Sequence, residues 1–524
     1  MNGSSVRLTA DPAEELAGRD VRRLTRGAAA ARAELTILGR AGDVFGHLVT
    51  GATVIALLGG SLQSFRTRMP GTTRPLIGPP LPGAVTVLAV SVMALAGVVF
   101  VLDRLGPLNA TPAAAAWWLP LPAGRRGLLL GQLARTTGVV LAVAIGVAVA
   151  PVVALTSHPT PATALIGLGW AAAPTAVVLA VTAVLQTRDR SGLLAPVAGA
   201  IAVLTALVVL TLAATTAIVP GALRLPATLA PPTWVEAALG ALAVLLLAVA
   251  ARGLDRISAA QLRGRGAVAG YAAASVLSLD TRDLGRALSG PSRRPRHSRR
   301  FAFVTRAWIA GCAADVAVLA RDRLRWGQLV LAVGIPELVA HIRATGSVPL
   351  AIWAACAAGW LLAAVAVAAP ARAANATPAI DRLLPLSTSE VVRTRFVVPL
   401  VVLAVVCGLT GLLLGLGAGG AGEWSVIALA GAPSWAAAAL RGAYRPDLDW
   451  SGELLATPFG PVPVGVVATM LQGIDVGVVG SLPLLLAFLH GGPTPALIAG
   501  QLAWSVGLSA IALSGLARRL GRPR

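Results

Sequence analysis

Residues 193–219 form the run LLAPVAGAIAVLTALVVLTLAATTAIV, in which no side chain is charged. At 1.5 Å per residue, a helix of about 20 such residues crosses the roughly 30 Å hydrocarbon core of a bilayer. Similar runs recur along the chain, whose residues are 56% hydrophobic and only 12% charged. Soluble domains carry about 25% charged residues. The sequence therefore predicts an all-α, polytopic helical membrane protein.

The apolar runs predict about 12 transmembrane helices, numbered here as spans one to twelve. Their boundaries lie near residues 44–62, 83–102, 136–157, 162–186, 193–219, 234–252, 326–342, 348–370, 396–418, 424–440, 462–489 and 493–515. The stretch before the first span, up to Arg40, is polar and charged where a secretory signal would be hydrophobic. We therefore expect no cleaved leader.

The arginines are sorted between alternate loops. The chain has 43 basic residues, all of them arginine, and 38 fall on the side that holds both termini. The opposite loops hold Arg66, Arg68, Arg74, Arg224 and Arg343. Cytoplasmic loops are enriched in basic residues, so both termini are predicted to be cytoplasmic in a multi-pass protein of the cell membrane. This bias accounts for the net charge of +21 without a nucleic-acid partner.

Two stretches repeat across the halves of the chain. AELTILGR at 33–40 aligns with ADVAVLAR at 314–321, and LPLP at 119–122 aligns with LPLS at 384–387. Each half holds six predicted spans, so the sequence predicts two parallel six-helix repeats. We expect a first repeat at 1–260, a basic cytoplasmic linker at 261–305, and a second repeat at 306–524.

The linker contains SGPSRRPRHSRR at 289–300, a proline-containing and densely basic stretch typical of disorder. This stretch either binds anionic lipid headgroups or an acidic partner, or it only reflects the enrichment of basic residues on the cytoplasmic side. The absence of lysine, together with abundant alanine, indicates a GC-rich bacterial genome.

Catalytic and metal-binding patterns are missing from the sequence. Cys312, Cys356 and Cys407 lie far apart, and the five histidines are scattered, so neither a disulfide framework nor a zinc site is indicated. No Ser-His-Asp arrangement or paired carboxylates occur at catalytic spacing. A Walker A loop requires lysine, which this chain lacks. We expect a protein that is not an enzyme and has no cofactor of its own.

The motif Leu119-Pro120-Leu121-Pro122 precedes the third span, and Leu384-Pro385-Leu386-Ser387 precedes the ninth. Proline is favoured at the first position of a helix, so each motif is predicted to begin a short helix along the cytoplasmic interface. A longer helix is predicted before each half, at about 13–40 and about 301–323.

These features resemble the permeases of type-2 ABC exporters. In that family an amphipathic helix precedes the first span, and a coupling helix between spans two and three contacts the ATPase. The resemblance implies a separate ABC-type ATP-binding subunit, in two copies, that binds ATP and Mg. It assigns contact with that subunit to Leu119, Pro120, Leu121, Pro122, Arg125, Arg126, Leu384, Pro385, Leu386 and Ser387. Glu390 departs from the doubly basic pattern at Arg125-Arg126, which puts equal contacts at the two motifs in doubt.

Ionisable groups within spans are costly unless they face a cavity or a partner. Asp475 lies near the middle of the predicted eleventh span, and it either handles substrate or protons or bonds a neighbouring helix. Glu337, in the outer half of the seventh span, either has such a role or meets water. His47, at the inner end of the first span, is a weaker candidate, because an interfacial polar cap explains it equally well.

Two other functions remain open on the sequence. Major facilitator transporters also have six-plus-six parallel repeats, and Asp103-Arg104-Leu105-Gly106 resembles part of their loop signature, without its preceding glycine and following basic residues. A membrane scaffold without transport is the third alternative. The substrate itself leaves no signature in the short, weakly charged outer loops.

Overall fold

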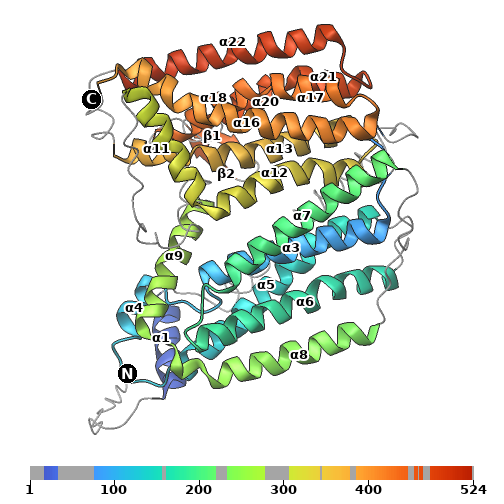
Figure 1. Cartoon of the computed structure of the whole chain (residues 1–524). Helices are drawn as coiled ribbons and strands as arrows, with labels where there is room; N and C mark the ends of the chain where they lie inside the picture. The colour runs from blue at the N-terminus through green and yellow to red at the C-terminus, as the bar shows by residue number, and fades with distance from the viewer. Residues whose placement is uncertain are drawn as a thin grey trace. The chain divides into compact units, whose positions relative to one another are not determined.

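Long apolar segments fold as helices in lipid, because only a helix satisfies every backbone hydrogen bond within one segment. The computed structural model in Figure 1 describes residues 17–32, 76–78, 80–155, 161–219, 233–277, 306–342, 345–377, 385–446, 454–457, 460–463 and 472–521. Within these ranges, nine helices are long and apolar enough to cross a membrane. The chain is thus a polytopic helical membrane protein, as the sequence predicted.

The nine helices correspond to nine of the predicted spans. They are α3 (Gly83–Leu105), α5 (Arg125–Leu155), α6 (Pro161–Thr187), α7 (Leu194–Ile218), α8 (Thr233–Arg252), α13 (Pro349–Val367), α16 (Thr388–Ala418), the pair α17 (Ala421–Ala430) and α18 (Ala432–Ala443), and α22 (Pro495–Leu520). The tenth predicted span is therefore two helices, which meet at Gly431. Pro433 follows at the start of α18, where proline is tolerated because the N–H it lacks would be unpaired.

Three predicted spans stand apart from these nine. The first, 44–62, lies outside the described residues. The seventh forms α12 (Arg323–His341), a helix of 19 residues that is not among the nine apolar helices.

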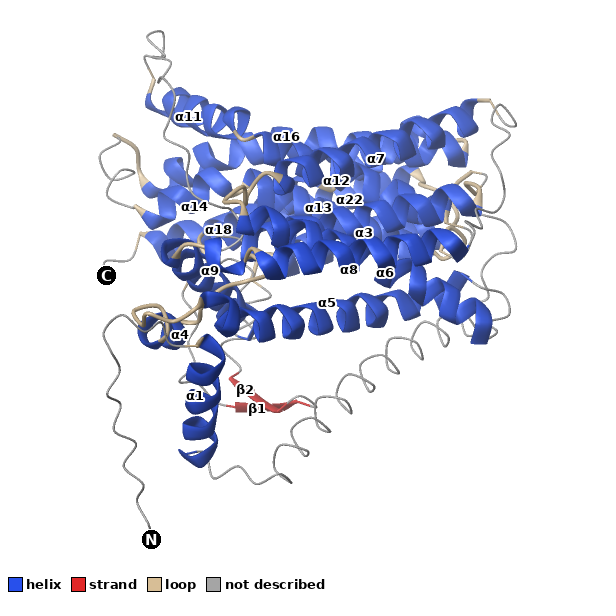
Figure 2. Cartoon of the chain, turned by 90° about the horizontal axis from the view of Figure 1, so that it is seen from below, coloured by secondary structure: helices blue, strands red, loops and turns tan. Residues whose placement is uncertain are grey.

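The prediction of one long eleventh span is wrong. Its first residues belong to strand β2 (Gly460–Pro463), which pairs antiparallel with β1 (Leu454–Thr457). Helix α20 begins at Ile474, after Gly473 with φ +104°, a conformation that favours glycine. Two short helices follow, α20 (Ile474–Gly480) and α21 (Leu482–Leu489). Figure 2 shows β1 and β2 as strands among helices in the described part of the chain.

The chain divides into two compact units, and two of the boundaries between them fall inside α3 and α7. Unit 1 takes its residues from 1–65, 95–198 and 231–291. Beside α5, α6 and α8 it contains α1 (Gly18–Arg32), α4 (Pro112–Trp117), the 3-10 helix η1 (Leu254–Arg256) and α9 (Ala259–Leu277). Helix α6 packs against both α5 and α8.

One end of unit 1 is held by polar side chains that bond the backbone. Buried Gln186 donates to the Leu108 carbonyl at 2.5 Å and accepts from the Leu108 N–H at 3.1 Å. Asp103 accepts from the N–H groups of Gly192 and Ala195, each at 2.8 Å, and thereby caps the start of α7. Buried polar groups are stable when paired in this way. Asp103 belongs to the segment that resembles the loop signature of major facilitator transporters, and it thus has a structural role here.

Unit 2 takes its residues from 66–94, 199–230 and 292–524. It adds α11 (Ala307–Arg321) and α14 (Ala369–Ala376) to α12, α13, α16, α17, α18, α20, α21 and α22. Figure 1 shows α12, α13 and α16 side by side, with α22 at the edge of the unit beyond α17 and α18. Its core contains the fully buried Trp360 and Trp435, whose rings meet edge to face at 6.1 Å. Glycines allow close packing, because a Cβ on Gly359 would lie 2.3 Å from the Ala332 carbonyl oxygen.

Candidate functional site

The first proline motif lies in the turn between α4 and α5. Thr111 caps α4 by accepting from the Ala114 N–H at 3.2 Å, and α4 ends at Trp117 before the motif begins. The motif does not begin a short helix, so that prediction is wrong. Proline in this turn instead precedes α5, which begins at Arg125.

The start of α5 is fixed to the segment after α8. The Arg125 guanidinium donates to the Ile257 carbonyl at 2.5 Å, and the Arg126 N–H donates to the Asp255 carboxylate at 2.7 Å. Most side chains near these two hydrogen bonds are exposed. Those exposed are Trp117, Pro120, Leu121, Pro122 and Arg126, whereas Leu119 and Arg125 are half-buried.

Helix α1 packs against the first turns of α5. A Cβ on Gly18 would lie 2.1 Å from the Gly124 carbonyl oxygen, so only glycine permits this approach. The Arg22 guanidinium donates to the Leu128 carbonyl at 3.3 Å. The described residues of α1 confirm a helix within the predicted range 13–40, and they place it beside the helix that follows the motif.

The second motif leads directly into α16. Leu384 lies outside the described residues, while Pro385 and Ser387 are exposed and Leu386 is half-buried. Ser387 is the N-cap of α16 and forms a capping box with Glu390. This box satisfies backbone N–H groups of the first turn, which explains why a carboxylate stands where the first motif has arginine. Here too the short helix, α14, precedes the motif instead of beginning at it.

Helix α11 packs against the first turns of α16. Asp315 of α11 forms an ion pair with Arg395 of α16, and both side chains are largely buried. The Cys312 thiol lies 3.6 Å from the Thr394 carbonyl oxygen. Burial, reinforced by the negative charge of Asp315, raises the pKa of Cys312 above its ordinary value. The arrangement matches unit 1, where an amphipathic helix packs on the helix after the motif.

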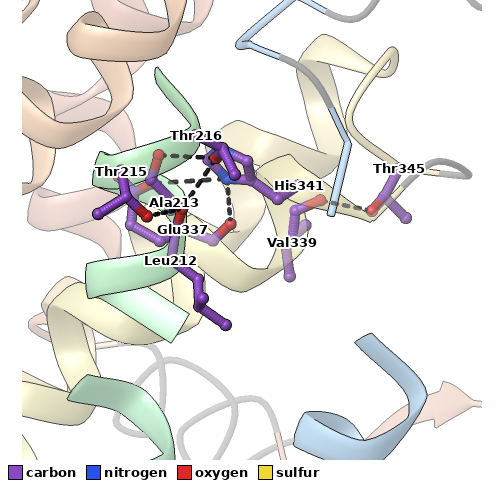
Figure 3. Close-up of polar contacts among 8 residues, drawn as sticks. All are labelled: Leu212, Ala213, Thr215, Thr216, Glu337, Val339, His341 and Thr345. Atoms are coloured by element: carbon purple, nitrogen blue, oxygen red, sulfur yellow. Dashed lines mark hydrogen bonds and ion pairs between the residues drawn. The ribbon is translucent and has the colours of Figure 1, made fainter. Parts of the chain in front are cut away.

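Glu337 and His341 form a buried ionisable pair on α12 (Figure 3). Glu337 is 0% exposed and His341 is 2% exposed. His341 Nδ1 lies 2.9 Å from the Glu337 carbonyl oxygen and 3.6 Å from the Glu337 carboxylate. Neither carboxylate oxygen has a hydrogen-bond partner in the described part of the chain. The expectation that Glu337 meets water is therefore wrong. The alternative that Glu337 handles substrate or protons stays open, because a buried carboxylate within a span is costly unless it has a function.

Three further segments surround this Glu337–His341 pair. Figure 3 includes Thr215 and Thr216 of α7, but their hydroxyls donate to carbonyls of their own helix, at 3.0 Å and 2.9 Å for the Leu212 oxygen. The Leu81 N–H donates to the His341 carbonyl at 3.0 Å, and the Thr345 hydroxyl donates to the Val339 carbonyl at 2.6 Å. These hydrogen bonds lie at the C-terminal end of α12, and neither of them involves the Glu337 carboxylate.

Asp475 does not lie in the middle of a span. It occupies the first turn of α20, where its carboxylate accepts from the Gly473 N–H at 2.8 Å and pairs with the Arg441 guanidinium at 3.3 Å. Its side chain is 43% exposed. A carboxylate at a helix N-terminus is favourable through the helix dipole, so the structural alternative explains this bond pattern.

One residue that the sequence predicted lies outside the described part of the chain, and other residues of these sites were not predicted. His47 lies outside the described residues. Among the residues the structure describes, no group of His, Cys, Asp or Glu could hold a metal ion. His341 was missed, although its spacing of four from Glu337 places both on one helix face. Arg441 and Arg395 had no such signal, because their partners are distant in sequence.

No curated protein and no solved structure matches the chain. Residues 80–453, more than half of the chain, match the model of a family of unknown function, DUF6297, and the chain belongs to that family.

Proposed function

We propose that this chain is the membrane permease of an ABC-type exporter, which moves an unidentified substrate across the cytoplasmic membrane. A separate subunit hydrolyses the ATP. One observation carries the proposal: in each unit a helix that precedes the spans packs on the first turns of the long helix that follows a Leu-Pro-Leu motif. This is the arrangement expected where pre-span helices and coupling segments together form a surface for an ATPase.

The surface in unit 1 has the composition of a protein interface. Trp117, with 74% of its side chain exposed, stands beside exposed Leu121 and Arg126. Tryptophan and arginine dominate the residues that carry binding energy at interfaces. Because Arg125 and the Arg126 backbone anchor the start of α5, a force on this surface would pass into a helix of 31 residues.

The surface in unit 2 is chemically different, and the proposal accommodates that difference. Glu390 is committed to the capping box of α16, so exposed Pro385 and Ser387 would meet the ATPase without a doubly basic partner. We therefore expect the two units to contact two ATP-binding subunits unequally. ATP and Mg belong to those subunits, since the chain has no lysine for a phosphate-binding loop.

The experiment is co-purification of the full chain with the ABC-type ATP-binding protein encoded beside its gene. Trp117→Ala should weaken the association by about tenfold or more, because a buried interface tryptophan contributes roughly 2 kcal/mol or more. Tyr271→Ala is the matched control, since Tyr271 is an aromatic residue of unit 1 that is 67% exposed on α9.

Two outcomes would overturn the proposal. The first is that no ATP-binding protein co-purifies, and efflux from cells persists after its gene is removed. The second is that Trp117→Ala and Tyr271→Ala leave association equally intact, which would remove the surface at α4 from the interface. Unfolding temperatures of the variants separate lost contacts from lost folding.

A further inference from the structure

A basic pocket lies between the ends of α18 and α22 in unit 2. Its volume is about 340 Å³, and its polar lining consists of Arg441, Gln472, Arg518 and Arg519. Arg441 comes from the last turn of α18, and the other two arginines come from the last turn of α22. Three guanidinium groups thus converge on one pocket.

The positive charge in this pocket is only partly compensated. Asp475 pairs with Arg441 at 3.3 Å. Within the described residues, Arg519 donates to the Tyr444 carbonyl at 2.5 Å, and Arg518 donates to the Ser514 carbonyl of its own helix at 3.4 Å. A guanidinium group has five donors, so most donors of these arginines remain available within the described part of the chain. The pocket can therefore donate several hydrogen bonds to an anion.

The rest of the pocket wall is apolar and continues onto the side of α22. Ile511 and Leu516 line the pocket, and Ile511 is 69% exposed. Trp504, seven residues before Ile511 and therefore on the same face of the helix, is also exposed, at 45%. Helix α22 has 26 residues and therefore measures about 39 Å, enough to cross the hydrocarbon core and bring its last turn to the headgroup region.

We propose that this pocket binds the phosphate of an anionic phospholipid, whose acyl chains lie along the apolar side of α22. Arginine recognises phosphate oxygens through paired N–H donors, and Gln472 adds an amide donor. A soluble anion would also accept hydrogen bonds from the guanidinium groups, but it would make no apolar contact with Ile511 and its exposed neighbours. The inference does not depend on an ATPase partner, because it uses only residues of unit 2.

The test uses the purified full chain, stripped of lipid in detergent, and native mass spectrometry with phosphatidylglycerol or phosphatidylcholine of equal chain length. We expect phosphatidylglycerol to bind more tightly. Arg518→Gln should weaken its binding about fivefold, the contribution of one basic residue near a charged lipid surface. The matched control is Arg190→Gln, which removes an exposed arginine outside the pocket and should have no effect.

A second variant changes binding in the opposite direction. Asp475→Asn removes the carboxylate that competes for Arg441, so it should tighten phosphatidylglycerol binding. Damage to the fold does not produce tighter binding, which makes this variant independent of stability. Equal binding of the two lipids, weaker binding by Asp475→Asn, or equal losses in Arg518→Gln and Arg190→Gln would each overturn the proposal. Inorganic phosphate that binds as tightly as the lipid would identify a soluble anion as the ligand.

Discussion

Glu337 combines complete burial with a carboxyl group that has no hydrogen-bond partner in the described residues. Burying an unpaired polar group costs about 1–3 kcal/mol. We predict that Glu337→Met, an apolar replacement of similar length, raises the temperature of thermal unfolding in detergent. His341 retains its bond to the residue 337 carbonyl in this variant, because that acceptor belongs to the backbone.

The control for this prediction is Glu423→Met in α17, which replaces an exposed carboxylate and should change the unfolding temperature little. A lower unfolding temperature for Glu337→Met would show that the carboxyl group stabilises the fold. If the prediction holds, the wild-type chain retains a destabilising group at this position. Such a group is expected at functional sites, where stability is given up for activity.

Cys312 supplies a prediction that depends on pH. Its pKa is raised by burial and by Asp315, so less of it is thiolate at neutral pH than in an ordinary cysteine. Only the thiolate reacts with iodoacetamide. Labelling of Cys312 should be slow near pH 7 and should accelerate as the pH rises toward the raised pKa. Peptide mass spectrometry measures this rate.

Cys356 and Cys407 serve as internal controls, since both are fully buried in unit 2 and should remain unlabelled throughout the pH series. Rapid labelling of Cys312 at pH 7 would contradict the packing of α11 on α16. Loss of the labelled peptide in Cys312→Ser identifies the reacting residue.

For single residues, the sequence indicated which side chains are unusual in an apolar span, but it did not predict which residues they contact. Glu337 stood out because a carboxylate in an apolar run is costly, and that reasoning needs no partner. The surroundings of Asp475 depend on Arg441, which lies in another helix, and on where α20 begins. The Asp315–Arg395 pair joins residues 80 positions apart, and no local pattern indicates such a contact.

Helices were more predictable than their interruptions. Length and hydropathy suffice to locate a span, so nine predicted spans correspond to the nine membrane-length apolar helices of the described chain. The breaks at Gly431 and Ser481 occur inside apolar runs, where hydropathy does not change. The short helices α4 and α14 end at Trp117 and Ala376, before their proline motifs, and the position of these ends could not be read from the motifs themselves.

The contact between α16 and α17 gives a prediction at the level of helices. A Cβ on Gly411 would lie 2.2 Å from the Trp424 carbonyl oxygen, a backbone atom that cannot move alone. Gly411→Ala should therefore destabilise unit 2 by about 1–3 kcal/mol, the usual cost of overpacking. A lower unfolding temperature in detergent would measure this loss.

Gly507→Ala is the matched control, because it makes the same substitution in α22 where nothing lies within 4 Å of the added atom. Alanine favours helix more than glycine, so this variant should keep or slightly raise stability. Equal effects of the two substitutions would mean that α16 and α17 do not approach as closely as the glycine implies.

At the scale of the whole chain, the arginine distribution is the strongest global regularity in the sequence. The family model covers residues 80–453 and therefore includes parts of both units. The two six-helix repeats and the linker at 261–305 stay predictions, as does the cytoplasmic position of both termini. These properties concern orientation and ancestry, which helix packing alone does not determine.

Orientation can be tested with single cysteines in a chain whose three native cysteines are replaced by serine. Val219→Cys lies at the predicted outer end of the fifth span and His490→Cys in a predicted outer loop, while Arg190→Cys and Leu121→Cys lie in predicted inner loops, and all four positions are exposed. A membrane-impermeant thiol reagent should label the first two in intact cells and the second two only after permeabilisation. The expected pattern follows from the sorting of 38 arginines to one side. Labelling of Leu121→Cys from outside would reverse the orientation and remove the first proline motif from the reach of a cytoplasmic ATPase.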